Sequence, residues 1–295
     1  MNENEVARIG PPASLRFDAN VSILFPRVSV HEQPAAAVAV GFDAIEMWWP
    51  FPVDVPADRD IDDLVDAVKS ADVKLVSLNM TLGDHATNQH GLVAIPGAGS
   101  QFRDHVDVVC GIAERLGVKV LNALYGNTPP EVPREELDDT AVENLAFAAI
   151  HGAAVGATVV LEALNPVDFP RYGLHRTRQS LDLADRVRAE TGADVGILFD
   201  VYHVQRSEGD IIARIEEHAT RFAHVQIADV PRRLRPGTGE ISWEHVLPAL
   251  ESAGYRGFVG LEYRPSVDPG DTFSWLPLAR RSTRGVGLRN GTLER

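Results

Sequence analysis

The chain has 295 residues, and 44% of them are hydrophobic, which is enough to bury a large core in one α/β barrel. Its formal net charge is −14, from 28 basic and 42 acidic residues. This balance argues against nucleic acid or an anionic membrane as the main partner, because both require a basic surface. The chain has 1 cysteine, Cys110, so no disulfide framework can form within it and a reducing compartment is expected.

The N-terminus lacks the basic-then-apolar pattern of a secretory signal. No apolar run approaches the roughly 20 residues that a membrane-spanning helix needs. We therefore expect a soluble, cytoplasmic protein.

Short apolar runs alternate with amphipathic stretches along the whole chain. The runs that predict strands are 15–25, 44–49, 74–80, 119–125, 158–165, 195–201, 222–229 and 257–264. The stretches that predict helices are 31–40, 60–70, 101–116, 135–155, 177–190, 208–219 and 242–252. Many of these helices stop at a glycine, namely Gly41, Gly117, Gly156, Gly192 and Gly254. A repeated order of helix, glycine and short apolar run is typical of β/α units in a parallel sheet.

These elements predict an α/β protein that folds as a single (β/α)₈ TIM barrel over residues 14–280, because no Pro/Gly/Ser-rich linker divides the chain. Residues 1–13 are expected to be a flexible tail. Residues 281–295 are Arg- and Gly-rich without periodicity and predict a flexible or partner-packed tail. The alternative fold is an open doubly wound sheet, which lacks support because no early strand is followed by a glycine-rich phosphate loop.

Oxygen-bearing side chains end several of the predicted strands. The second strand ends near Glu46, and the last four give Glu162, Asp200, Gln226 and Glu262. Catalytic groups of such barrels lie at the C-terminal ends of strands, so these side chains are expected to share one mouth. His224 shares a face with Gln226, one layer deeper, where a hydrogen-bonded core histidine is favoured over a ligand.

Carboxylates crowded together without a cation repel one another and raise each other's pKa, and a divalent ion removes this conflict. Carboxylate and amide oxygens suit Mg²⁺ or Mn²⁺, whereas zinc prefers histidine and cysteine. The alternative is that each carboxylate pairs with an arginine or caps a loop, which is disfavoured for four consecutive strand ends. Asp200 is therefore predicted to be a metal ligand, with His203 on the following loop facing the substrate.

Several stretches resemble the hydroxypyruvate isomerase family, in the xylose isomerase-like barrel superfamily, and the resemblance covers roughly residues 15–278. Two runs are the most specific, His224-Val225-Gln226-Ile227-Ala228-Asp229 and Pro236-Gly237-Thr238-Gly239-Glu240. The resemblance implies a metal ion held by Glu162, Asp200, Gln226 and Glu262. It also implies that Glu162 and Glu262 act as the acid–base pair.

The activity that this resemblance implies is a metal-dependent isomerase of the aldose–ketose type. It would interconvert hydroxypyruvate and tartronate semialdehyde through an enediolate, with Mg²⁺ or Mn²⁺ as cofactor. Related ketose 3-epimerases carry histidine where this chain has Gln226, so the glutamine favours the isomerase branch.

Four side chains are expected to contact a small anionic substrate: Glu46, His85, His203 and Arg233. A chain with a net charge of −14 does not attract an anion through its overall field, so a local cation is needed. Arg233 lies at the family's arginine position on the loop after the seventh strand, and arginine grips a carboxylate bidentately. The alternative is that Arg233 is a solvated loop charge.

Other functions remain open from the sequence. A second enzymatic interpretation is an isomerase or epimerase of another short sugar or sugar acid, such as 2-oxo-tetronate. A DNA-repair endonuclease of the same fold would need a basic cleft and more histidine ligands. A non-catalytic sugar-binding module leaves the clustered carboxylates unexplained. The oligomeric state is open, with a homo-oligomer among the alternatives.

Overall fold

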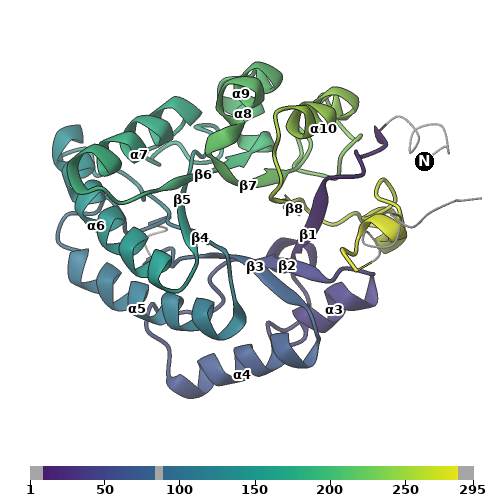
Figure 1. Ribbon diagram of the computed structural model, residues 1–295, viewed down its shortest axis with the longest axis horizontal. Helices are drawn as coiled ribbons and strands as arrows, with labels where there is room; N and C mark the ends of the chain where they lie inside the picture. Colours follow the sequence, from purple (N-terminus) through teal and green to yellow (C-terminus); the bar gives the residue numbers. More distant parts are fainter. Residues whose placement is uncertain (1–8, 84–88, 285–295) are drawn as a thin grey trace, which may run out of the picture.

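The computed structural model describes residues 9–83 and 89–284, which form a closed barrel of eight parallel strands. The strands follow one another in chain order, and β1 pairs with β8 to close the barrel (Figure 1). Their bounds are β1 Arg16–Asn20, β2 Ala44–Met47, β3 Lys74–Asn79, β4 Val120–Asn122, β5 Thr158–Glu162, β6 Gly196–Asp200, β7 Phe222–Ile227 and β8 Phe258–Leu261. The predicted (β/α)₈ barrel is confirmed.

Helices surround the barrel and cover its outer face (Figure 1). The α-helices are α2 Val21–Leu24, α3 Gln33–Ala39, α4 Asp58–Ser70, α5 Gly99–Leu116, α6 Arg134–Ala154, α7 Thr177–Thr191, α8 Val201–Ser207, α9 Ile211–His218 and α10 Trp243–Ser252. Short 3₁₀ helices are η1 Ala219–Arg221, η2 Pro269–Asp271 and η3 Leu278–Arg280. Within the described ranges, no helix is long and apolar enough to cross a membrane.

Two predicted elements have different bounds in the structure. The first strand stops at Asn20, because its side-chain oxygen accepts a 3.3 Å hydrogen bond from the Ile23 N–H and starts helix α2. The helix predicted over 208–219 is preceded by the separate helix α8. Gly209 and Asp210 divide α8 from α9 with φ angles of 65° and 51°, which a helix cannot accommodate.

The predicted glycine stops are confirmed at the ends of α5 and α7. Gly117 follows α5 with φ of 70° and Gly192 follows α7 with φ of 75°. Each N–H donates back to a carbonyl of the last turn, which satisfies part of the helix end. These caps turn the chain sharply toward the next strand.

The inside of the barrel is mostly polar toward the C-terminal ends of the strands. Strand register places Asn20 beside Glu46, Asp200 beside Gln226, and Gln226 beside Gly260. Beneath this level, a small apolar cluster fills the interior with Val120, Val160 and Leu198. The large hydrophobic core lies elsewhere, where the outward faces of the strands meet the helices.

The chain beyond η3 is attached to the barrel as far as residue 284. The buried carboxylate of Asp43 accepts hydrogen bonds from the Thr283 N–H at 2.9 Å, the Thr283 hydroxyl at 2.8 Å and the Ser282 hydroxyl at 3.0 Å. Arg281 donates to the carbonyl oxygen of Val40 at 3.0 Å. The first residues of the predicted C-terminal tail are therefore hydrogen-bonded to the barrel, and residues 285–295 lie outside the described residues.

Candidate active site

The five strand-end residues singled out from the sequence lie within one buried network at the mouth of the barrel. Glu46, Glu162, Asp200, Gln226 and Glu262 are each at most 4% exposed. A cavity of about 240 Å³ opens above them, and its polar lining includes Glu162, His203, Arg233 and Glu262. Its apolar wall consists of Trp48, Leu82, Leu124, Leu164 and Phe169. We call this cavity the reaction pocket, and its size suits a small molecule.

Asp200 ends β6 and serves two purposes. Its Oδ1 accepts hydrogen bonds from the Tyr202 N–H at 2.7 Å and the His203 N–H at 3.4 Å, which caps helix α8. Its Oδ2 has no hydrogen-bond partner among the described residues, although it is buried. Burial raises the pKa of Asp200, against the opposing effect of Arg233. The helix cap explains why an acidic residue ends this strand, and Oδ2 has only longer contacts, to His203 Nε2 at 3.5 Å and Arg233 Nη2 at 3.7 Å.

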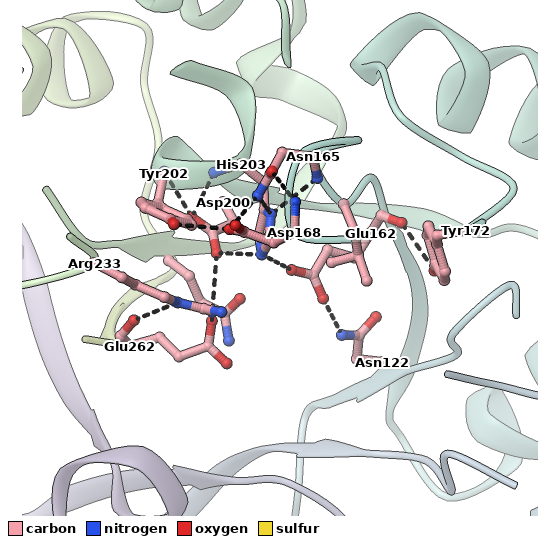
Figure 2. A network of polar contacts seen from close by, with 12 residues as sticks. Asn122, Glu162, Asn165, Asp168, Tyr172, Asp200, Tyr202, His203, Arg233 and Glu262 are labelled. Atoms are coloured by element: carbon pink, nitrogen blue, oxygen red, sulfur yellow. Dashed lines mark hydrogen bonds and ion pairs between the residues drawn. The ribbon is translucent and has the colours of Figure 1, made fainter. Parts of the chain in front are cut away.

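His203 lies one helical turn beyond Asp200 and has a defined tautomer. Its Nδ1 accepts the backbone N–H of Asn165 at 3.0 Å, so the proton of the neutral ring lies on Nε2. That Nε2 is 3.5 Å from Asp200 Oδ2 and 3.9 Å from Glu162 Oε1 (Figure 2). Burial, together with Arg233 and Arg206, holds the pKa of His203 well below its usual range. His203 is therefore a neutral hydrogen-bond donor that points at the carboxylates.

Glu162 ends β5 and is oriented by a neighbouring amide. Asn122, at the end of β4, donates a 2.7 Å hydrogen bond to Glu162 Oε2 (Figure 2). Burial raises the pKa of Glu162 well above its usual range, and the nearby Glu262 and Asp200 raise it further. The amide thus fixes one oxygen, while Oε1 faces the reaction pocket beside His203.

Glu262 follows β8 and is held by donors on both oxygens. Its Oε1 accepts the indole N–H of Trp48 at 2.6 Å and the amide of Asn20 at 3.3 Å. Its Oε2 contacts Nη2 of Arg233, which also lies 3.7 Å from Asp200 Oδ2. Burial raises the pKa of Glu262 to about 7, against the opposing effect of Arg233. Arg233 therefore balances two carboxylates of this network.

A deeper layer orients Gln226. Its amide nitrogen donates to Glu46 Oε1 at 2.9 Å, which leaves Gln226 Oε1 buried and without a partner among the described residues. Glu46 also binds Nε2 of His224 at 2.5 Å, so His224 is a hydrogen-bonded core histidine as predicted. Burial and the neighbouring Glu46 raise the pKa of Asp18, whose two oxygens also lack partners.

The donor set suits a hard divalent cation. Gln226 Oε1 is buried without a hydrogen-bond partner among the described residues, and Asp200 Oδ2 is buried with only the longer contacts to His203 and Arg233. Strand register places the two residues side by side. Glu162, Asp200 and His203 each offer one atom within 4.8 Å of the others. Unpaired buried oxygens are costly, and a cation satisfies them without adding a proton. The residues present therefore fit the Mg²⁺ or Mn²⁺ expected from the sequence.

The loop after β7 carries Arg233 and is organised by one carboxylate. Asp229 Oδ2 accepts the N–H groups of Gly237 at 2.9 Å, Thr238 at 3.0 Å and Gly239 at 2.9 Å. The indole N–H of Trp243 donates to the same oxygen at 3.0 Å. A Cβ on Gly239 would lie 1.7 Å from the Val230 carbonyl oxygen, so only glycine fits there. This explains the Asp and Pro-Gly-Thr-Gly runs as parts of one loop.

Sequence reasoning missed the groups that orient the site: Asn20, Trp48 and Asn122 donate to its carboxylates, Asn79 accepts from Asn122, and Asn165 donates to His203. Three of them end β1, β3 and β4, so reading every strand end for polar side chains would have found them. His85 lies outside the described residues. Glu46 is not among the residues that line the reaction pocket, and it is hydrogen-bonded to Asn20, His224 and Gln226.

The fold and this site define a class of barrel enzymes with a polar, carboxylate-lined mouth. Residues 34–279 match the family model of the xylose isomerase-like TIM barrel. A relative from Streptomyces coelicolor is 42% identical over 92% of this chain and 99% of its own, and its assignment as a hydroxypyruvate isomerase is itself provisional. The chain belongs to the hydroxypyruvate isomerase family of the xylose isomerase-like TIM barrels.

Three further proteins illustrate the range of the family. The hydroxypyruvate isomerase of Escherichia coli K12 is 34% identical over 89% of this chain and 98% of its own. The 2-oxo-tetronate isomerase of Cupriavidus necator is 32% identical over 88% and 97%. A crystal structure from Brucella melitensis, named AP endonuclease, family 2, superposes with a TM-score of 0.81 at 34% identity, covering 88% of this chain and 97% of that one.

Proposed function

We propose that this protein is a metal-dependent isomerase that interconverts hydroxypyruvate and tartronate semialdehyde. The observation that carries the proposal is the pair Glu162 and Glu262, which line one reaction pocket of about 240 Å³ from different strands. Both are buried carboxyl groups with raised pKa values, as groups that exchange protons near neutral pH require. The names of the E. coli and S. coelicolor relatives support the substrate.

The reaction moves one proton between adjacent carbons. One glutamate takes a proton from the hydroxyl-bearing carbon, and the other, as a carboxylic acid, delivers one to the carbonyl carbon. The hydroxyl proton is transferred between the two oxygens in the same process, so atoms balance and no oxidant is needed. Asn122 on Glu162 and Trp48 on Glu262 leave each carboxyl group one defined orientation for these transfers.

Charge develops on the substrate oxygens during this transfer. Glu162, Asp200, Gln226 and Glu262 would hold Mg²⁺ or Mn²⁺, and the bound ion would supply Lewis-acid stabilisation of those oxygens. The Nε2–H of His203 would donate a hydrogen bond to a substrate oxygen, since its tautomer is fixed by Asn165. His85 and Glu46 remain candidates for substrate contact and orientation.

Arg233 would bind the substrate carboxylate. It lines the reaction pocket, and its guanidinium has further N–H donors besides the Nε and Nη2 groups that contact Glu262. Charge-assisted hydrogen bonds contribute about 1.5–3 kcal/mol each, so Arg233→Ala should raise KM for hydroxypyruvate about 10- to 100-fold. The same substitution should raise KM much less for dihydroxyacetone, which has no carboxylate.

A second candidate function is isomerisation of a four-carbon sugar acid such as 2-oxo-tetronate. The C. necator relative supports it, and the same carboxylates would serve both substrates. A nuclease, as the name of the Brucella structure suggests, is less well supported because the chain has a net charge of −14 and nucleic acid binding requires a basic surface.

The experiment that tests the proposal is an isomerisation assay with three- and four-carbon keto acids, after EDTA treatment and after adding back Mg²⁺ or Mn²⁺. We expect turnover of hydroxypyruvate only in the presence of metal. Full activity of the chelated protein would refute the metal-dependent mechanism. Turnover of the four-carbon acid alone would favour the second candidate.

A further inference from the structure

A second cavity adjoins the reaction pocket. Its volume is about 510 Å³, and it shares Phe169 and Arg233 with the reaction pocket as a common wall. Its polar lining is Asp168, Tyr202, Arg206, Arg232, Arg233 and Arg264. We call this cavity the arginine vestibule. It is larger than the reaction pocket and lies at the same mouth of the barrel.

The vestibule carries a local excess of positive charge. Arg206 is paired with Asp168, with Nη2 3.4 Å from Oδ1, and Arg233 is paired with Glu262. Arg232 and Arg264 are exposed, and neither forms an ion pair or a side-chain hydrogen bond with any residue of the two described ranges. Two uncompensated guanidinium groups thus face a cavity in a chain whose net charge is −14.

The arginines are attached to ordered backbone. Arg233 adopts a left-handed conformation with φ of 56°, and its carbonyl accepts the Arg264 N–H at 2.8 Å, which ties together the segments after β7 and β8. Arg206 donates to the Pro231 carbonyl at 2.9 Å and lies over the Tyr202 ring. The Arg206 and Arg233 guanidinium groups are therefore held at the cavity wall by contacts of their own, whereas Arg232 and Arg264 are fixed there only through their backbone. Two guanidinium groups that are already positioned reduce the ordering that anion binding requires.

We propose that the arginine vestibule is an anion subsite that captures an acidic substrate and holds its carboxylate while the reacting carbons occupy the reaction pocket. This inference rests on the proposed function, because it assumes that the substrate is a small keto acid. It extends recognition of the carboxylate from Arg233 to Arg232 and Arg264, which have donors to spare. It also explains how a strongly acidic protein attracts an anion, since a local cationic funnel accelerates encounter.

The first test measures anion binding without catalysis. Sulfate is titrated calorimetrically into the EDTA-treated protein, and the double variant Arg232→Gln/Arg264→Gln is compared with Lys69→Gln/Arg188→Gln. The control removes the same charge from exposed residues near the C-terminal ends of α4 and α7, at the opposite end of the barrel. We expect one sulfate site that the vestibule variant weakens about 10-fold or more and the control leaves unchanged. Equal binding by wild type and vestibule variant would overturn the proposal.

The second test uses turnover. For the vestibule variant we expect kcat/KM for hydroxypyruvate to fall about 10-fold or more and to lose its decline with ionic strength, because steering charges are gone. The kcat/KM for dihydroxyacetone should change less than 2-fold. Sulfate should compete with hydroxypyruvate. Non-competitive inhibition by sulfate would mean that the vestibule binds a separate anion, and it would refute the proposal that the vestibule binds the substrate carboxylate. If hydroxypyruvate is not turned over at all, the proposed function fails, and sulfate binding alone decides whether the vestibule binds anions.

Discussion

The side-chain amide of Gln226 donates a 2.9 Å hydrogen bond to Glu46 Oε1, and its own oxygen is buried without a hydrogen-bond partner among the described residues. Without such a partner, the amide could rotate and place its N–H₂ group where the oxygen now lies. An amide N–H₂ group is a hydrogen-bond donor and does not coordinate a cation. Glu46 therefore acts on the site through Gln226. Gly260 makes room for it, since a Cβ there would lie 2.6 Å from Glu46 Oε2.

We predict that Glu46→Gln weakens metal binding. The substitution keeps the shape but removes the charge that binds His224, puts an N–H₂ group in place of the oxygen facing His224, and weakens the oxygen that accepts from Asn20 and Gln226. Loss of such an outer-shell contact typically costs about 10- to 100-fold in metal affinity. Calorimetric titration of Mn²⁺ into both proteins measures the effect. Unchanged affinity would show that Glu46 does not orient Gln226.

The proton-transfer pair can be tested with isosteric amides. Glu162→Gln and Glu262→Gln should each reduce kcat by about 10²-fold or more, because neither amide can accept the substrate proton. Exchange of substrate hydrogen with D₂O, followed by NMR, separates removal of the proton from its delivery. Circular dichroism checks the fold. Near wild-type turnover by either variant would contradict the proton-transfer role assigned to that glutamate.

Trp48 is expected to support Glu262 through its indole N–H, at 2.6 Å from Oε1. Trp48→Phe removes this donor and keeps most of the apolar surface, so we expect kcat to fall about 10-fold, in line with one hydrogen bond to a charged group. Trp49→Phe is the matched control, since the Trp49 indole donates to the Val53 carbonyl. Equal effects of the two substitutions would point to packing of the tryptophan pair instead.

Asp229 should be important for stability. In Asp229→Asn, an amide N–H₂ replaces one of two oxygens that together accept six hydrogen bonds from Val230, Gly237, Thr238, Gly239, Ile241 and Trp243. We expect the free energy of unfolding to fall by about 2 kcal/mol or more, because buried donors lose their acceptor. Urea denaturation measures this value. Asp271→Asn, which alters the ion pair with Arg235 on the same loop, should have a smaller effect.

The contact between Asp43 and residues 282–284 predicts a pH dependence of stability. Burial acts to raise the pKa of Asp43, but the donors of Thr283 and Ser282 outweigh it and lower the pKa below its usual range. The unfolded chain therefore binds this proton more readily, at a pKa of about 3.9. The stabilisation is fully present above that pH and is lost as the pH falls through the lower folded value.

This dependence is measured by comparing wild type with Asp43→Asn in urea denaturation at pH 7 and at decreasing pH. The difference in stability between the two proteins should shrink below pH of about 4. A difference that stays constant down to pH of about 2 would mean that the Asp43 carboxylate contributes nothing through its charge.

The order of elements and the strand-end carboxylates were readable from the sequence because both depend on local pattern. Apolar runs and glycine stops identify β/α units, and a parallel barrel brings every strand end to one mouth. The break at Asn20 was not foreseen, because it depends on one side-chain cap inside an apolar run. The division between α8 and α9 also rests on local backbone angles, at Gly209 and Asp210.

Contacts between distant residues could not be read in the same way. The amides that orient Glu162 and Glu262 come from β1 and β4, and nothing in the spacing of Asn20 or Asn122 indicates which carboxylate each one meets. The pairing of Arg233 with Glu262 and Asp200 likewise depends on how the loop after β7 folds over the mouth. Such contacts become visible only when the barrel is closed.

The thin apolar cluster of Val120, Val160 and Leu198 has an evolutionary consequence. Most of the hydrophobic core lies between the strands and the helices, so the interior of the barrel contributes little to holding the fold together. Side chains at the mouth can then be substituted, and the substrate preference changed, without unfolding the barrel. A barrel whose lumen is polar in this way is well placed to diversify, and new activities can arise on it by substitution rather than by redesign.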